Sequence, residues 1–361
     1  MLPCLYIDLN AVAYNYGLCK SFVTSAKTAA VIKNNAYGLG TKEISKKLYE
    51  EKGCRYFFVA YADEAVSVRS VAPEATIYLL NGFDIKDIHL IKQFCLTPVL
   101  SSLGQYEQWK QADISTVKPA LQVESGLNRL GISYEQASAL SNSERKTFSL
   151  ILSHLACADE PDNLMNINQK QELERFKSLF PNALFSLSAS DGLGLGMDFH
   201  FDMVRVGAFM YGLKTCPPLN DKQKQVVRAE VSVIQSKQLQ KDDTAGYSQA
   251  FTAKRPTRLL ALSVGYADGL LRSLSNKGCV FFFYNNQWLK APIVGRISMD
   301  ITLCDITDLP EEIEFAQKAY LLNDNYTFDD MGQDAGTIGY ETLSLLCNSP
   351  RWQKKYIPFE S

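Results

Sequence analysis

Residues 28–60 read TAAVIKNNAYGLGTKEISKKLYEEKGCRYFFVA, and this stretch contains one copy of the pattern that sets the fold. A short apolar run, TAAVIK, ends at Lys33, and a second, YFFVA, ends at Ala60. The residues between the two runs are largely polar and charged, with apolar side chains at helical spacing. Short apolar runs separated by amphipathic stretches are typical of βα units in a parallel sheet.

The same alternation continues to about residue 210. The six further runs are ATIYLL ending at Leu80, LTPVLSS ending at Ser102, KPALQVE ending at Glu124, FSLILSHL ending at Leu155, ALFSLS ending at Ser188 and MVRVG ending at Gly207. Eight strands predict a (β/α)8 TIM-like barrel over residues 9–216, near the small end of the size range for that fold. A doubly wound open sheet is the alternative, although such sheets usually have fewer strands.

The pattern changes after Pro217. The segments that follow alternate or cluster as strands between turn residues: VVRAEVSVIQSKQ, RLLALSVGYA, CVFFFYNN, KAPIVGRI and DITLCDIT. We therefore expect a mostly β C-terminal domain over residues 217–361, with residues 1–8 packed against it. The run PPLNDKQKQ, rich in proline and charge, marks the boundary between the two domains.

Composition narrows the class of protein. Of the 361 residues, 46% are apolar and 21% are charged, which is typical of an ordinary soluble globular protein. The formal net charge of -2 gives no electrostatic reason to bind nucleic acid or an anionic membrane, so small molecules or further copies of the chain are the expected partners. Nine scattered cysteines without CxxC pairs argue against a disulfide framework and favour a reducing cytoplasm. The three histidines have no zinc-site spacing with cysteines, and the N-terminus shows neither a signal peptide nor a membrane anchor.

Four polar residues lie near the carboxyl ends of the predicted strands, where barrel enzymes place their active sites. They are Lys33, His154, Ser190 and Arg205. Lys33 follows an apolar strand, and desolvation there would lower the pKa of its amine and leave a neutral nucleophile for a Schiff base. The alternative is a lysine that enters solvent where its strand ends. For His154 the plainer interpretation is a satisfied core histidine.

The loops after the seventh and eighth strands often form a phosphate site in this fold. Ser190 and the Gly207-Ala208 pair fall in these loops, although small residues could equally serve only to make tight turns. Arg205 lies inside an apolar run, where a guanidinium is costly unless it is paired, so we expect a hydrogen-bond acceptor beside it. The GLGLG run at 192–196 does not follow the first strand of a βαβ unit, which argues against a dinucleotide site.

Seven motifs together resemble the ordered motifs of alanine racemases. They are AVIKNNAYGLG (30–40), NRLGI (128–132), SHLACADEPD (153–162), VRVGAFMYG (204–212), SVGYADG (263–269), VGRISMD (294–300) and TIGYE (337–341). Any one could occur by chance, but the lysine motif, VGYADG and GRISMD are jointly specific, and the match extends along essentially the whole chain. The resemblance implies a fold-type III isomerase that uses pyridoxal 5'-phosphate (PLP). It also implies a head-to-tail homodimer that interconverts L-alanine and D-alanine and supplies D-alanine for bacterial peptidoglycan.

The resemblance further implies a role for each matching residue. Lys33 would hold the cofactor as an imine and exchange a proton on one face of the substrate α-carbon. Tyr266, contributed by the partner subunit, would exchange it on the other face, although a tyrosine in a β domain is usually a packing residue. Arg205 would face the pyridine nitrogen, and His154 would link it to Tyr266.

The implied phosphate contacts are Tyr37, Ser190, Gly207, Ala208 and Tyr340. Arg129 and the backbone of Met299 are implied to hold the substrate carboxylate and the phenolic side of the cofactor. Asp300 would support the loop that contains Met299.

Three positions depart from the family pattern, and three alternatives stay open. Gln122 stands where many members have a lysine, carbamylated in some, so Arg129 needs a different partner. Ser186 and Ala189 stand where many members have histidine and asparagine. The alternatives are a broader amino-acid racemase acting for example on serine, a non-catalytic PLP-binding protein, and a fold-type III decarboxylase. Arg205 argues against the decarboxylase, whose ring nitrogen typically meets a carboxylate.

Overall fold

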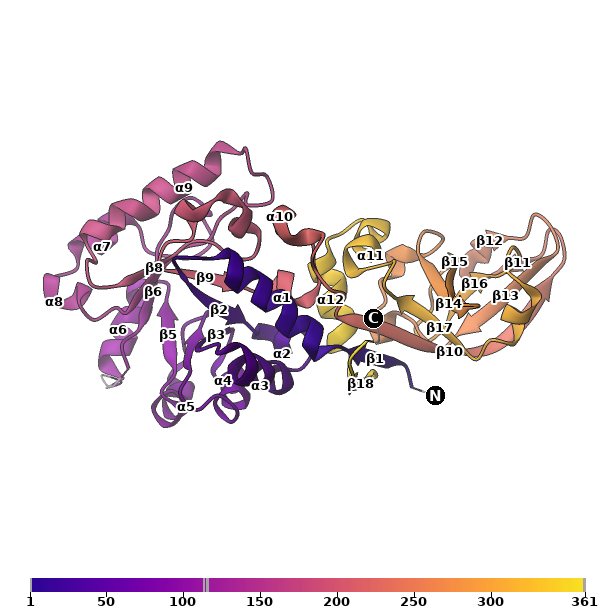
Figure 1. Cartoon of the computed structure of the whole chain (residues 1–361), viewed down its shortest axis with the longest axis horizontal. Helices are drawn as coiled ribbons and strands as arrows, with labels where there is room; N and C mark the ends of the chain where they lie inside the picture. The colour runs from indigo at the N-terminus through magenta and orange to yellow at the C-terminus, as the bar shows by residue number, and fades with distance from the viewer. Residues whose placement is uncertain (1, 113, 115–116, 360–361) are drawn as a thin grey trace.

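The computed structural model describes residues 2–112, 114 and 117–359. It contains two eight-stranded sheets, which form two lobes along the long axis of the molecule (Figure 1). Helices α11 (Phe328–Ala335) and α12 (Gly339–Asn348) lie where the two lobes meet (Figure 1).

The N-terminal sheet is parallel and closes into a barrel. Its strands are β2 (Lys27–Val31), β3 (Tyr56–Val59), β4 (Thr76–Leu79), β5 (Thr97–Leu100), β6 (Ala120–Gln122), β7 (Leu150–Leu152), β8 (Leu184–Ser186) and β9 (Met203–Val206). Each strand from β2 to β8 pairs with its neighbour in the chain, and β9 pairs with β2. A parallel bridge between Ala189 and Arg205 closes the ring between β8 and β9. The predicted barrel is confirmed, and the open doubly wound alternative is wrong.

Side chains from alternate strand positions fill the interior of the barrel. This inner cluster consists of Ala29, Val31, Phe58, Tyr78, Val99, Ala120, Leu150, Leu152 and Met203. The rings of Phe58 and Tyr78 stack with their centroids 4.5 Å apart. Because the interior is packed in this way, the space for a ligand lies at the end of the barrel rather than inside it.

Helices surround the barrel (Figure 1). They are α1 (Leu9–Phe22), α2 (Lys33–Tyr37), α3 (Thr41–Lys52), α4 (Ala62–Arg69), α5 (Ile88–Phe94), α6 (Leu103–Gln111), α7 (Tyr134–Ala139), α8 (Asn142–Arg145), α9 (Leu164–Arg175) and α10 (Pro217–Asn220). Among the helices of the described ranges, none combines the length and the apolar composition that a membrane span requires.

The second sheet is mostly antiparallel and includes the first strand of the chain. Its strands are β1 (Cys4–Ile7), β10 (Val227–Leu239), β13 (Thr257–Leu262), β14 (Cys279–Tyr284), β15 (Gln287–Val294), β16 (Thr302–Asp305), β17 (Lys318–Leu322) and β18 (Gln353–Tyr356). Strand β1 pairs antiparallel with β10 and parallel with β18. Two short strands, β11 (Thr244–Ala245) and β12 (Phe251–Thr252), form a separate pair. The mostly β character predicted for this part of the chain is confirmed.

Two details differ from the prediction. The barrel strands end one to three residues before the apolar runs do, so that Lys33 lies beyond β2 rather than at its end. The run continues past the strand because the turn that follows is itself partly buried, as Ile32 and Ala36 are. Helices α11 and α12 were not predicted, because the β pattern dominates the segments before them.

Candidate active site

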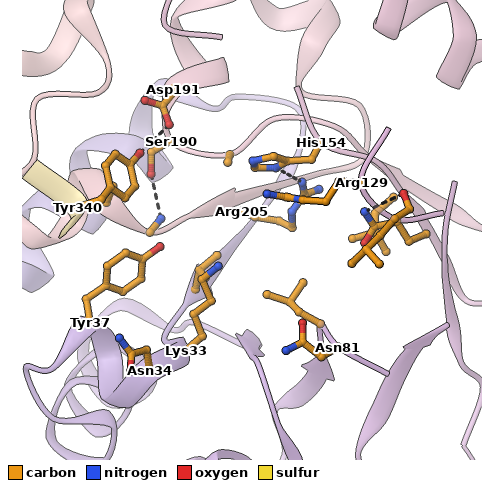
Figure 2. Close-up of a pocket in the computed structure, with 18 of the residues that line it drawn as sticks. Lys33, Asn34, Tyr37, Asn81, Arg129, His154, Ser190, Asp191, Arg205 and Tyr340 are labelled. Atoms are coloured by element: carbon orange, nitrogen blue, oxygen red, sulfur yellow. Dashed lines mark hydrogen bonds between the residues drawn. The ribbon is translucent and has the colours of Figure 1, made fainter. Parts of the chain in front are cut away.

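A cavity of about 560 Å³ opens at the carboxyl ends of the barrel strands. Most of the residues selected from the sequence line it: Lys33, Tyr37, Arg129, His154, Ser190, Arg205, Gly207, Ala208 and Tyr340. In Figure 2 the aromatic and hydroxyl side chains lie to one side of Lys33, and the cationic side chains lie to the other. The cavity therefore has one wall of hydroxyl groups, which could donate hydrogen bonds to a phosphate, and another wall that carries the arginine side chains.

Lys33 begins a left-handed turn, α2, two residues after β2 ends. Residues 34–37 all have φ between 51° and 57°. Such a conformation costs about 1–2 kcal/mol per residue for most L-amino acids, and Asn tolerates it best. The carboxylate of Glu64 fixes the turn to the neighbouring strand, because it accepts hydrogen bonds from the backbone amides of Asn34 (2.6 Å) and Ala60 (2.7 Å). The turn aims the Lys33 side chain into the cavity (Figure 2).

The surroundings of Lys33 favour its neutral amine. Lys33 is accessible through the cavity, but the protein around it limits hydration, and this desolvation lowers the pKa of its amine below the usual value. The positive charges of Arg129 and Arg205 lower that pKa further, and Glu64 opposes them. A neutral amine is the form that attacks a carbonyl carbon.

Arg205 is buried in β9 and holds its guanidinium against neutral acceptors. Its Nη1 donates to the Ser186 hydroxyl, and its Nη2 donates to the carbonyls of Ser153 (2.7 Å) and Leu187 (3.1 Å) and to Nδ1 of His154 (3.3 Å). The expected acceptors are thus present. Burial lowers the pKa of Arg205 to about 10, so it stays cationic at neutral pH. Within the described part of the chain no carboxylate pairs with it, and these bonds leave its Nε for a group in the cavity.

His154 is a neutral neighbour of this cation. Burial, Arg205, Arg129 and Lys33 together lower the pKa of its imidazole to about 3. Because Nδ1 accepts from Arg205, the ring proton is on Nε2. His154 can therefore accept from Arg205 and donate on its opposite side at the same time.

Ser190 organises the opposite wall. Its hydroxyl oxygen accepts hydrogen bonds from the backbone amides of Gly207 (2.9 Å) and Phe209 (3.4 Å), so the hydroxyl proton is left to donate elsewhere. A side chain at Gly207 would place its Cβ 3.1 Å from the Tyr37 hydroxyl, which explains why a glycine lies here. The Tyr37 ring packs against that of Tyr211 at 4.8 Å. The Gly207 amide thus donates to Ser190, and the predicted phosphate contacts at Gly207 and Ala208 stay predictions.

Tyr340 reaches this wall from α12, and its hydroxyl is also engaged. It donates to a carboxylate oxygen of Asp191 at 2.8 Å. Asp191 directly follows Ser190 and lines the same cavity (Figure 2). Asp191 could not be recognised from the sequence, because its contact with Tyr340 joins residues 149 positions apart.

The positions that depart from the family pattern lie at the other end of the cavity or beside Arg205. Gln122 donates from its side-chain nitrogen to the carbonyl of Leu130 (3.5 Å), so it contacts the backbone next to Arg129. No hydrogen bond or ion pair of the Arg129 guanidinium is found among residues 2–112, 114 and 117–359. Ser186 accepts from Arg205, and Ala189 forms part of the cavity wall.

Tyr266 and Met299 do not line this cavity within the single chain. Both lie in the C-terminal lobe, 43% and 53% exposed, respectively. They are close to one another, because the Tyr266 amide donates to the carbonyl of Ser298, and the Ala267 amide donates to that of Met299. The structure therefore divides the predicted catalytic residues between a cavity and a separate exposed surface. Because Tyr266 is expected from the partner subunit, the link from His154 to Tyr266 stays a prediction.

Arg351 ties the two loops that carry Tyr266 and Met299. It forms ion pairs with Asp268 (3.0 Å) and Asp300 (2.5 Å). Asp268 is buried and also accepts from the Gly265 amide at 2.8 Å. Arg351 and Glu64 are positioning residues that the sequence analysis missed. A glutamate five residues after a strand, in the first turn of a helix, is a local signal that could have revealed Glu64.

Comparisons with known proteins cover both lobes. Residues 7–215 match the family model for the alanine racemase N-terminal domain, and residues 226–356 match the model for the C-terminal domain. The chain is 38% identical to the catabolic alanine racemase of Agrobacterium fabrum, an alignment that covers 98% of this chain and 92% of that relative. It is also 38% identical to the alanine racemase of Rickettsia africae, with 97% and 98% covered.

Solved structures agree with these matches. The fold is similar to that of the alanine racemase from Bartonella henselae with covalently bound pyridoxal phosphate, with a TM-score of 0.91 and 34% identity over 99% of this chain and 100% of that one. It is also similar to the biosynthetic alanine racemase from Pseudomonas aeruginosa, with a TM-score of 0.89 and 28% identity over 99% and 100% of the two chains.

Proposed function

The chain belongs to the alanine racemase family, and from this premise we propose how its own residues bind PLP and interconvert L-alanine and D-alanine. Membership makes the protein a PLP-dependent isomerase that racemises alanine. One observation carries the assignment of residues. A lysine with a lowered pKa lies between a wall suited to a phosphate and a buried guanidinium.

The residues present fit the cofactor. The neutral amine of Lys33 can bind its aldehyde carbon covalently, and the hydroxyl proton of Ser190 is left to donate to a phosphate. We assign the phosphate to Ser190, Tyr37, Tyr340 and the backbone at residues 207 and 208. The free Nε of Arg205 can donate to the ring nitrogen. When bound, the cofactor stabilises the negative charge that develops on the substrate α-carbon.

Two proton carriers on opposite faces are required to invert that carbon. We assign the amine of Lys33 to one face. We assign the phenol of Tyr266 to the other, supplied by a second copy of the chain, since Tyr266 lies outside the cavity of its own chain and is exposed. The Nε2 proton of His154 would then be available to the incoming phenol, and Arg205 would fix the other side of the imidazole.

Arg205 would also limit side reactions. With the cofactor bound, its permanent positive charge would oppose protonation of the ring nitrogen and so disfavour transamination. Its environment contains neutral acceptors rather than a carboxylate, which supports racemisation over the decarboxylase alternative.

We assign the substrate carboxylate to Arg129 and Met299. The Arg129 guanidinium lies at the cavity without a protein counter-ion in the described residues, which suits a carboxylate ligand. The Met299 backbone would reach the site with Tyr266, because the two share a surface. A racemase that also accepts serine stays the second candidate, since a hydroxyl on the substrate adds little volume.

We further propose a homodimer with shared active sites and a cytoplasmic location, where D-alanine would be made for peptidoglycan. Free thiols at all nine cysteines support a reducing compartment. For the domains we keep residues 9–216 as the PLP-binding barrel and 217–361 as the β domain, with residues 1–8 in the latter.

The experiment is a racemisation assay with the full-length protein and PLP on a panel of L-amino acids, with product chirality read by chiral chromatography. We expect L-alanine to approach an equal mixture of enantiomers, and Lys33→Ala to abolish this. A protein that binds PLP with visible absorbance but inverts none of the amino acids would instead support the non-catalytic PLP-binding alternative.

A further inference from the structure

The wall assigned to the phosphate contains a carboxylate. Asp191 begins the 3-10 segment Asp191–Leu195, directly after Ser190. It lines the same cavity as Tyr37 and Gly207, and its Oδ2 accepts the hydrogen bond of the Tyr340 hydroxyl at 2.8 Å. Figure 2 shows Asp191, Ser190 and Tyr340 side by side above Tyr37.

A tyrosine hydroxyl has one proton to donate. Tyr340 can therefore donate to Asp191 or to a bound phosphate, but not to both. A protonated Asp191 removes this conflict, because its own O–H can donate to the Tyr340 oxygen and free the Tyr340 proton for the phosphate. Ionised Asp191 would instead place a negative charge beside a second one.

The groups around Asp191 do not neutralise it. Those that face it from the neighbouring elements are Tyr37, Asp159, Lys214, Cys216, Asp329 and Tyr340. Burial raises the pKa of the Asp191 carboxyl, Asp159 and Asp329 raise it further, and the hydrogen bond from Tyr340 opposes them. Lys214 lines an adjoining cavity, but its amide donates to Asp329 and no described ion pair joins it to Asp191.

We propose that Asp191 couples cofactor binding to a proton, so that a phosphate ester on this wall binds tightly only when a proton is taken up by the pair formed by Asp191 and the phosphate. This inference rests on the proposed function, because it uses the same phosphate wall. Its consequence is that affinity for the phosphate falls as the pH rises, since the proton must come from solution.

The test measures binding rather than activity. The probe is pyridoxine 5'-phosphate, which has the ring and the phosphate but no aldehyde, and the protein is the full-length Lys33→Ala variant, so no imine forms. Calorimetry at pH 8 in two buffers of different ionisation enthalpy gives the net proton uptake. We expect it to exceed that of the same protein carrying Asp191→Asn by about one proton per site, because any proton that the ligand ring releases beside Arg205 is common to both proteins. From pH 7.5 to pH 9 the dissociation constant, taken relative to that of the Asp191→Asn protein, should rise about tenfold per pH unit.

Adding Asp191→Asn should remove this coupling. We expect about one proton less to be taken up per site and a dissociation constant that depends less steeply on pH. Binding should be about tenfold tighter or more at pH 8.5, because the like charge is gone and the side chain still contacts Tyr340. Asp191→Ser removes the charge with a smaller side chain and serves if the asparagine variant misfolds. Asp198→Asn is the matched control, since Asp198 lies in the next 3-10 segment (Met197–Phe199), is exposed and pairs with Lys170.

The outcomes separate the two proposals. Equal proton uptake with and without Asp191→Asn and Asp191→Ser, or an effect of Asp198→Asn as large as theirs, would overturn the role of Asp191 and leave the proposed function standing. Failure of pyridoxine 5'-phosphate to bind any of these proteins would overturn both the role of Asp191 and the assignment of the phosphate wall.

Discussion

The hydroxyl group of Tyr266 is what distinguishes a two-base racemase from an enzyme that exchanges the α-proton through Lys33 alone. Tyr266→Phe removes this hydroxyl and preserves the ring, so PLP binding should persist. We expect the exchange of the α-proton on the tyrosine face to fall on the order of 10²–10⁴-fold. Deuterium incorporation from solvent, measured separately from L-alanine and D-alanine, checks this. An equal loss from both enantiomers would remove the assignment of one residue to each face.

His154 gives a pH dependence of stability with a definite sign. The folded state holds the pKa of its imidazole at about 3, whereas an unfolded chain titrates near the ordinary value of 6.5. The unfolded state therefore binds the extra proton first, and the stability from neutral His154 is present above pH 6.5 and is lost as the pH falls towards 3. Between pH 7 and pH 5 the wild-type protein should lose unfolding free energy, and the His154→Gln variant should lose about 2 kcal/mol less. Urea denaturation at the two pH values measures both changes. The control is His89→Gln, because His89 is exposed, and an equal effect of the control would contradict the prediction.

The surroundings of a residue could be predicted from the sequence where a charged side chain lies within an apolar segment. A guanidinium inside an apolar run required acceptors, and the structure places Ser186 and two carbonyls against Arg205. Lys33 was selected in the same way. Asp191 was missed, because an acid in a loop is locally unremarkable and its partner Tyr340 comes from the other lobe.

The left-handed turn after β2 is the element that aims Lys33, and Asn34 offers a matched pair of tests. Asn34 is exposed and uses its backbone amide to contact Glu64, so a new side chain removes no described contact of the turn. Asn34→Val places a β-branched residue at φ 55° and should cost about 1–2 kcal/mol. Asn34→Gly should be close to neutral, because glycine accepts this conformation.

The readouts for this pair are thermal unfolding and PLP affinity. We expect the valine variant to lose affinity as well as stability, because the turn carries both Lys33 and Tyr37. If valine and glycine behave alike, the strain of the turn does not position Lys33.

Arg351 is the tie between the Tyr266 turn and the Met299 loop, and Arg351→Ala should let the two loops move apart. We expect exchange on the tyrosine face to fall on the order of 10-fold to 100-fold, with a smaller effect on the lysine face. Arg255→Ala is the control, since it removes an exposed ion pair with Asp308 in the same lobe. A uniform loss on both faces would indicate a general structural defect.

Strands were easier to predict than helices in this chain for a physical reason. Barrel strands are buried on both faces and give continuous apolar runs, so all eight were located. The predicted strand ends lay too far along the chain, because the turns that follow the strands are partly buried as well. In α11 the buried positions Phe328, Met331 and Ala335 do have helical spacing. Glycines at 332, 336 and 339 obscured that pattern and hid the helix that carries Tyr340.

Across the whole molecule, the fold places the two proposed catalytic residues in different lobes, so neither lobe holds both. Lys33 lies in the barrel lobe and lines the cavity, whereas Tyr266 lies in the β lobe and is 43% exposed. A head-to-tail pair of chains would bring the β lobe of each over the barrel of the other, and such symmetric dimers are the commonest soluble oligomers. Sequence patterns could not show this separation, because it depends on how the two lobes are placed.

Mixing two inactive variants tests the shared site directly. Lys33→Ala chains keep Tyr266, and Tyr266→Phe chains keep Lys33, so a mixed dimer contains one site with both residues intact and one site with neither. Random exchange of equal amounts, after mild denaturation and refolding, gives half mixed dimers and therefore about a quarter of the wild-type activity per site. If Lys33 and Tyr266 of the same chain worked together, every site in the mixture would lack one of them, and racemisation would stay at the level of the separate variants. Activity that returns on mixing and is absent when either variant is refolded alone requires that the proton on the second face comes from another chain.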